Sequence, residues 1–100
     1  MSRIKLGVFE IDDNKNIFFL SDNFMSMIGQ GTKKVEDVDT FKSIMNDLNR
    51  YLVRKENKKY IYEIPNNKKH IYIELNENEI ENGHVMGLIE DITERTLEKK

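Results

Sequence analysis

Apolar residues open the chain in two short runs that a polar turn separates. Residues 6–11 (LGVFEI) and 17–20 (IFFL) are rich in β-favouring types, and the segment Asp12–Asn16 between them is polar. Two such runs joined by a short turn predict a β-hairpin. Ser21–Asn23 then offers capping side chains for a short helix that begins at Phe24 and ends at the two glycines that follow.

The spacing of apolar residues becomes helical after Thr40. Apolar positions three and four residues apart form one face of an amphipathic helix. They are Phe41, Ile44, Met45, Leu48, Tyr51 and Leu52. We therefore expect a helix over residues 41–52, with Asp39 or Thr40 as its cap. The polar stretch between Gly31 and Thr40 is expected to form a loop or a single turn.

From Tyr60 onward apolar and polar residues alternate, which is typical of half-buried strands. Three strands are expected, over residues 60–64, 71–75 and 84–92. The final segment, Thr93–Lys100, is polar and helix-favouring. With the N-terminal hairpin, this order predicts an α+β fold in which a five-stranded antiparallel sheet has its helices packed on one face.

A candidate core follows from these faces. The residues expected to point inward are Phe9 or Val8, with Phe24, Met27, Ile28, Phe41, Ile44, Met45, Leu48, Ile71, Ile73 and Leu75. Such a core can stabilise one domain, and a chain of 100 residues leaves no room for two.

Composition and charge narrow the class of protein. The chain is 38% hydrophobic and 34% charged, as folded soluble proteins are. No apolar run approaches the roughly 20 residues of a membrane span, and residues 1–6 lack the apolar region of a signal peptide. We therefore expect a cytoplasmic domain, whose parent protein could still be membrane-anchored. A net charge of −2 gives nucleic-acid binding no support.

Three segments carry a family resemblance. Residues 6–11 with the turn after them, residues 17–29, and Gly87 followed by Asp-Ile-Thr-Glu-Arg at positions 91–95 together resemble bacterial PAS sensor domains. The resemblance covers about residues 4–95, and the last motif is its most specific part. It implies a PAS sensor domain over residues 1–92 and the start of a signalling or linker helix at residues 93–100. The chain departs from the family at Ser21, where Asn is common, and in its shortened stretch before Thr40.

The resemblance also implies a function. PAS domains of this type are sensory and dimerisation modules that relay a signal to a C-terminal effector, such as a diguanylate cyclase or a histidine kinase in a two-component system. We therefore expect a homodimer that is not an enzyme by itself. Two alternatives stay open: a ligand-free PAS domain that serves only dimerisation or protein–protein contact, and a small α+β enzyme. The enzyme would need convergent titratable groups in a pocket, and the sequence shows no nucleophile–base pair.

No cofactor is predicted. Cysteine is absent, which excludes disulfides, Cys-based zinc sites and the flavin adduct of photosensory PAS domains. The helix expected from Phe41 has no histidine for the haem arrangement of PAS sensors. His70 and His84 are expected at the surface, without the accompanying ligands of a metal site. A small, largely apolar cavity is the most we expect, with space for a non-covalent apolar ligand. Its candidate lining is Phe24, Met27, Phe41, Met45, Leu48 and Ile73.

The motif at positions 91–95 has a physical interpretation of its own. Asp91 can cap the helix that begins at Thr93, Glu94 can complete a capping box, and Arg95 lies one turn from Asp91. The resemblance implies that this junction, formed by Asp91, Thr93, Glu94 and Arg95, couples the sheet to the next domain.

In both the last and the first expected strand, apolar residues occupy odd and even positions alike. A one-sided sheet needs apolar residues only at alternate positions. Because the family topology places these strands side by side, we expect an apolar patch on the outer face, covered by a second subunit or a helix. The candidates for this contact are Val8, Val85 and Ile89, or their neighbours of opposite parity.

Overall fold

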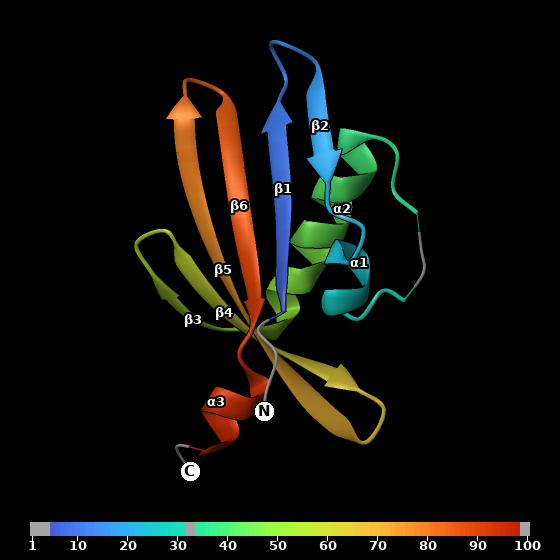
Figure 1. Ribbon diagram of the computed structural model, residues 1–100, viewed down its shortest axis with the longest axis vertical. Helices are drawn as coiled ribbons and strands as arrows, with labels where there is room; N and C mark the ends of the chain where they lie inside the picture. Colours follow the sequence, from blue (N-terminus) through green and yellow to red (C-terminus); the bar gives the residue numbers. More distant parts are fainter. Residues whose placement is uncertain (1–4, 32–33, 99–100) are drawn as a thin grey trace.

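A computed structural model describes residues 5–31 and 34–98 of the chain. The elements are β1 (Leu6–Asp12), β2 (Ile17–Leu20), α1 (Phe24–Met27), α2 (Val38–Leu48), the short 3-10 helix η1 (Asn49–Tyr51), β3 (Leu52–Glu56), β4 (Lys59–Asn66), β5 (Lys69–Glu81), β6 (His84–Asp91) and α3 (Thr93–Glu98). The fold is α+β, as expected, and Figure 1 shows the strands joined in one sheet beside the helices.

The described strands form a six-stranded antiparallel sheet in the order β2-β1-β6-β5-β4-β3. The first and last of the described strands, β1 and β6, are therefore neighbours, as the resemblance implies. Val8 of β1 lies opposite Leu88 of β6, and Phe9 lies opposite Gly87. Because side chains alternate between the faces of a strand, this register decides which residues of β1 and β6 share a face.

The sheet has six strands where the sequence predicts five. The expected helix over residues 41–52 ends at Leu48, and Leu52 instead begins β3 and pairs with Tyr62 of β4. β3 is an edge strand whose residues are mostly exposed, so its sequence lacks the alternation that burial of one face imposes. Asn57, with φ of 53°, turns the chain back into β4.

The start of α2 also lies earlier than the sequence predicts. Asp37 caps the helix, and its carboxylate accepts hydrogen bonds from the Thr40 backbone N–H at 2.8 Å and from the Thr40 hydroxyl at 2.9 Å. Neither Asp39 nor Thr40 is the capping residue. These two hydrogen bonds, the backbone one foremost, lower the pKa of Asp37 from its ordinary value.

One face of the sheet, called the inner face below, packs on α1 and α2. Phe9, Phe24 and Phe41 form its aromatic centre, with ring centroids 5.1–5.8 Å apart. Most of the predicted core is buried: Phe9, Phe24, Met27, Ile28, Phe41, Ile44, Leu48, Ile73 and Leu75. The exceptions are Met45 and Ile71, which are partly buried against this cluster.

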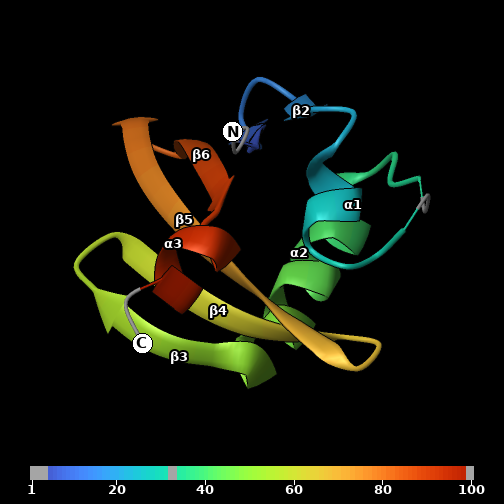
Figure 2. The ribbon, with the colours of Figure 1, turned by 60° about the horizontal axis from the view of Figure 1, so that its bottom comes forward.

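The helices do not all lie on one face. The inner face carries the buried Ile73 and Leu75 of β5. Tyr72 and Glu74 alternate with them along the strand, so their side chains lie on the opposite face. There they line a groove together with Thr96 of α3. α3 therefore lies against the other face, called the outer face below. Figure 2 shows α3 in front of the sheet, apart from α1 and α2. The one-face expectation is correct for α1 and α2 and wrong for α3.

Candidate functional site

The junction between β6 and α3 is built around the hydroxyl of Thr93. This hydroxyl donates to Asp91 Oδ1 at 2.6 Å and accepts from the backbone N–H of Tyr72 at 2.9 Å. Asp91 Oδ1 also accepts from the Thr93 backbone N–H at 2.9 Å, which caps the first turn of α3. The backbone N–H of Ile92 donates to the Tyr72 carbonyl at 2.9 Å. The start of α3 is thus tied to β5.

Two further contacts expected at this junction are not formed. Glu94 is exposed and completes no capping box with Asp91. Arg95 does not pair with Asp91, because its guanidinium reaches across the sheet to Glu74 Oε2 at 3.1 Å and to Glu90 Oε2 at 3.7 Å. The sequence motif therefore locates the strand-to-helix junction correctly, but the partners of Arg95 are Glu74 of β5 and Glu90 of β6 rather than Asp91.

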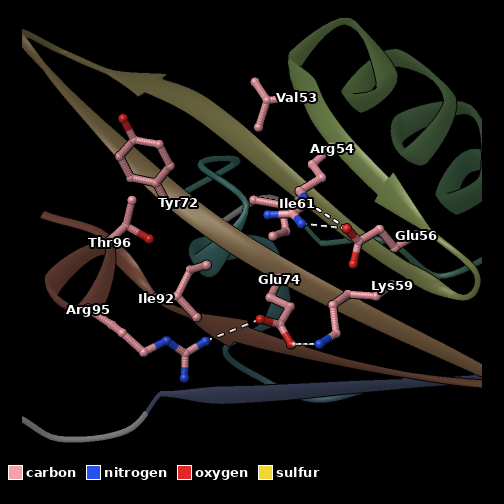
Figure 3. Close-up of a pocket in the computed structure, with 10 residues that line it drawn as sticks. All are labelled: Val53, Arg54, Glu56, Lys59, Ile61, Tyr72, Glu74, Ile92, Arg95 and Thr96. Atoms are coloured by element: carbon pink, nitrogen blue, oxygen red, sulfur yellow. Dashed lines mark hydrogen bonds and ion pairs between the residues drawn. The ribbon is translucent and has the colours of Figure 1, made fainter. Parts of the chain in front are cut away.

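Beside the junction lies a groove of about 580 Å³ on the outer face (Figure 3). Apolar side chains, including Ile61 of β4 and the buried Ile92, form part of its wall. Its charged residues are Arg54, Lys59 and Arg95 with Glu56 and Glu74. The groove thus places charged groups from β3, β4, β5 and α3 around an apolar surface.

Glu74 links the charged groups of this groove. Its side chain is only 13% exposed, and its two oxygens receive Lys59 at 3.7 Å and Arg95 at 3.1 Å (Figure 3). Lys59 begins β4 and Arg95 belongs to α3. A largely buried carboxylate shared by two cations is more constrained than an exposed ion pair, so Glu74 links α3 to the start of β4.

A larger cleft of about 860 Å³ lies between α2 and the inner face. Of the six residues expected to line a cavity, Phe41 and Met45 do so. The other four, Phe24, Met27, Leu48 and Ile73, are buried in the packed core instead. Sequence periodicity identifies inward-facing residues, but it does not show which of them border empty space.

The cleft is larger than the sequence suggests, and charged and polar groups stand beside its apolar lining. Its lining includes Lys42, Lys55, Tyr60, Tyr62 and Glu77. The chain segment between Gly31 and α2 is short, but α2 is still held far enough from β4 and β5 to leave space. Polar residues that the sequence does not single out are therefore part of the site. For the two tyrosines the sequence gives one signal, since they occupy alternate positions of β4 that face inward.

The two tyrosines keep their protons. Burial raises the pKa of Tyr62 to about 12, with the negative charge of Glu77 as a further cause. The pKa of Tyr60 is also raised, by desolvation first and then by Glu77, to which its hydroxyl is hydrogen-bonded. The Lys55 ammonium lies 5.4 Å from the centre of the Tyr60 ring. The cleft can therefore offer neutral phenols, a carboxylate and an ammonium to a bound molecule.

Each histidine lies beside a carboxylate, and neither belongs to a metal centre in the described part of the chain. His84 Nε2 lies 2.5 Å from Glu10 Oε2, and His84 Nδ1 lies 3.6 Å from Asp12 Oδ2. The two carboxylates sit at opposite nitrogens of the ring, so they cannot converge on one ion. Within residues 5–31 and 34–98 no group of three potential ligands has metal-binding geometry. His70, as expected, is exposed and pairs with Glu63, whereas the His84 side chain is largely buried.

The candidate contact face is divided between the two sides of the sheet. Ile89 is 1% exposed in the core, and Val85 packs against the core from the same side. Val8 lies opposite Leu88 and therefore belongs to the outer face. The outer patch consists of Leu6, Val8, Phe19, Met86 and Leu88. The opposite-parity neighbours on β6, rather than Val85 and Ile89, thus accompany Val8.

Comparisons with family models, curated proteins and solved structures give no match to the chain. Among the described residues, no helix has the length and apolar character needed to cross a bilayer.

Proposed function

We propose that the chain is a PAS-type sensory module of a bacterial signalling protein, which relays a signal through α3 to a C-terminal effector such as a diguanylate cyclase or a histidine kinase. The observation that carries this proposal is the junction at Thr93. A central strand, β6, passes directly into α3 there, and hydrogen bonds fix the helix start to β5. In this proposal residues 1–92 form a cytoplasmic sensor domain and residues 93–100 begin the output helix.

β5 supplies a physical route between the cleft and the output helix. Leu75 and Glu77 of this strand line the cleft on the inner face. Tyr72 and Glu74, a few residues earlier, hold Thr93 and Arg95 on the outer face. A ligand that shifts β5 from the cleft side must therefore alter the contacts that position α3. Coupling of this kind requires different ligand affinities for the two positions of the strand.

The cleft favours a small molecule with both apolar and polar parts. Phe41, Met45 and Leu75 offer apolar contacts, whereas Tyr60 and Glu77 offer hydrogen bonds. Ligand sites in proteins combine a mainly apolar lining with a few polar groups that orient the ligand. A mixed ligand of this kind replaces the purely apolar one that the sequence suggests.

Dimerisation is the second part of the proposal. Leu88 is 40% exposed and Met86 is 38% exposed on the outer face, next to Val8. Exposed apolar patches of this kind mark surfaces that another chain or a helix covers. A PAS domain without a ligand, acting only in dimerisation or protein–protein contact, is the alternative that this patch favours by itself.

An enzyme of the same fold class is less well supported. Tyr60 and Glu77 do converge in the cleft, which is the condition that the enzyme hypothesis requires. The raised pKa of Tyr60, however, keeps its hydroxyl protonated near neutral pH, where it is a poor nucleophile or base. Among the described residues that line the cleft there is no Ser, Cys or His. These groups are better suited to binding than to catalysis.

Native mass spectrometry followed by hydrogen exchange tests the sensor proposal. Freshly purified protein is weighed intact to detect a copurified small molecule, and loaded and stripped protein are then compared by amide exchange. We expect the ligand to protect β5 and to change exchange in residues 92–98. Glu77→Gln should weaken binding, and Glu79→Gln, an exposed neighbour on the same strand, is the control. Bound ligand with unchanged exchange in α3 would contradict the relay.

The ligand-free alternative predicts a different result. No small molecule would accompany the protein, and the oligomeric state would depend on the outer patch. A protein that carries no ligand but dissociates when Leu88 is replaced by Lys would favour this second function. A strict monomer with neither ligand nor association would contradict both functions.

A further inference from the structure

The two edge strands of the sheet, β3 and β2, differ in how they are protected against pairing with a strand of another chain. β3 carries Arg54, Lys55 and Glu56 as exposed charged residues, and its pairing with β4 is interrupted by a register shift at Val53. β2, at the other edge, has the sequence Ile-Phe-Phe-Leu, without charge or proline, and its register with β1 is continuous. Natural sheets protect edges with charges, proline and bulges. β3 has charges and a bulge, whereas β2 has neither, and its length of four residues is the one protective feature that it shows.

The backbone of β2 presents hydrogen-bonding groups at this edge. Ser21 N–H donates to the Val8 carbonyl at 2.9 Å. In an antiparallel ladder every second residue points its N–H and C=O groups to the same side, so those of Phe19 also point towards β1. Phe18 and Leu20 then direct their N–H and C=O groups away from β1. Among the described strands β2 pairs only with β1. The outward groups of Phe18 and Leu20 are therefore available to a further strand.

The side chains of β2 divide between the two faces. Phe18 packs inward, with its ring centroid 5.6 Å from that of Phe41. Phe19 lies on the outer face and is 52% exposed. An aromatic side chain is thus exposed in the middle of the strand, at the edge where the backbone groups are open.

We propose that β2 pairs antiparallel with β2 of a second copy of the chain, about a twofold axis that passes between the two Phe19 residues. In this register Phe18 of each copy faces Leu20 of the other, and their backbone groups form the hydrogen-bonded pairs of the new ladder. The two Phe19 residues then face each other directly as a pair without hydrogen bonds, where side chains come closest. The two sheets become one continuous sheet.

The open edge of β2 is self-complementary, which favours β2 of a second copy of the chain as the strand that pairs with it. The twofold axis on Phe19 matches donors with acceptors without any change in the strand, as an isologous interface requires. Lys15, which also pairs with Glu81 of its own chain at 3.3 Å, and Asp22 are exposed and flank the apolar strand at its two ends. Antiparallel pairing brings Lys15 of one copy towards Asp22 of the other, whereas parallel pairing would bring like charges together. This inference does not rest on the sensor function proposed above.

Single cysteines provide the first test, because the native chain has none. Directly opposed residues in a pair without hydrogen bonds have Cα atoms about 4.5 Å apart, which is within the range that a disulfide spans, about 4.4–6.8 Å. Phe19→Cys should form a covalent dimer on mild oxidation several times faster than Val53→Cys, an equally exposed position on β3. Leu88→Cys reports separately on the outer face.

Sedimentation velocity of Phe19→Lys is the second test. The new charge should oppose pairing with another strand, as the charged residues of β3 do at the other edge. We expect the native chain to form a dimer at high protein concentration and Phe19→Lys not to, while circular dichroism and the thermal midpoint of the variant stay close to native. Leu88→Lys should leave the β2-mediated dimer in place, even where it weakens the separate contact through the outer patch that the proposed function invokes. Crosslinking of Phe19→Cys no faster than Val53→Cys overturns the proposal, as does a native chain that stays monomeric. Loss of the dimer with Leu88→Lys alone overturns it and assigns association to the outer face.

Discussion

The ring of Phe9 occupies the space in which a side chain at Gly87 would lie. The two residues are directly opposed in β1 and β6, and a Cβ atom built at position 87 would be 2.0 Å from Phe9 Cε2. Phe9 is also in contact with the rings of Phe24 and Phe41. The absence of a side chain at position 87 thus lets the first strand deliver its aromatic residue to the centre of the core.

Gly87→Ala should therefore destabilise the fold. The added methyl group must displace the Phe9 ring from a packed aromatic cluster, and overpacking of this kind costs about 1–3 kcal/mol. Chemical denaturation measures the loss. Gly87→Ala combined with Phe9→Leu should cost less than the two single changes added together, because the smaller side chain makes room for the methyl group. Strict additivity would show that the two positions do not compete for space.

Ile73 is the second core position that denaturation can test. It is fully buried in β5, beneath the helices of the inner face. Ile73→Ala removes buried methyl groups and leaves a cavity, so the free energy of unfolding should fall by about 2–5 kcal/mol. Ile80→Ala, at an exposed position near the tip of the same strand, should change it by less than about 0.5 kcal/mol. Equal effects at the two positions would contradict the assignment of the inner face.

Asp37 makes the capping of α2 dependent on pH. Its pKa is lowered from 3.8 because its carboxylate accepts hydrogen bonds from the N–H and hydroxyl of Thr40. A lowered pKa in the folded state means that the carboxylate stabilises the fold above pH 3.8 and that this contribution is lost as the pH falls through the folded pKa. Asp37→Asn retains an oxygen that can cap but does not titrate. On acidification below pH 4 the native chain should lose stability relative to the variant in parallel denaturation curves. A difference that is constant with pH would contradict this.

Local chemistry in the sequence predicts some elements well and others poorly. The hairpin of β1 and β2 and the junction at Thr93 follow from turn and capping residues that act within a few positions. β3 does not, because Arg54, Lys55 and Glu56 are all exposed at an edge and leave no alternating pattern. Leu52 continues the helical spacing of α2 but lies in β3, where it pairs with Tyr62 of β4 and packs against the core.

The long-range features of the sites could not be predicted for a related reason. Val8 shares a face with Leu88 because of the register between β1 and β6, and no local signal fixes that register when both strands are apolar at both parities. The nearer of the two carboxylates that pair with Arg95 is Glu74, 21 residues away on β5. Sequence spacing suggests only the neighbour one helical turn away, Asp91, which instead binds Thr93.

The hydroxyl of Thr93 should control how firmly α3 is attached to the sheet. Thr93→Val keeps the shape of the side chain but removes the group that accepts from the Tyr72 N–H and donates to Asp91. Loss of hydrogen bonds by partly buried groups costs about 1–3 kcal/mol. We expect faster amide exchange in residues 92–98 and a matching fall in the free energy of unfolding. Thr93→Ser keeps the hydroxyl and should restore most of the protection. Thr96→Val, in the next turn of the helix, is the control for a general effect of β-branched apolar substitution in α3. Equal exchange in Thr93→Val and Thr96→Val would show that helix propensity, and not the hydroxyl, decides how α3 is held.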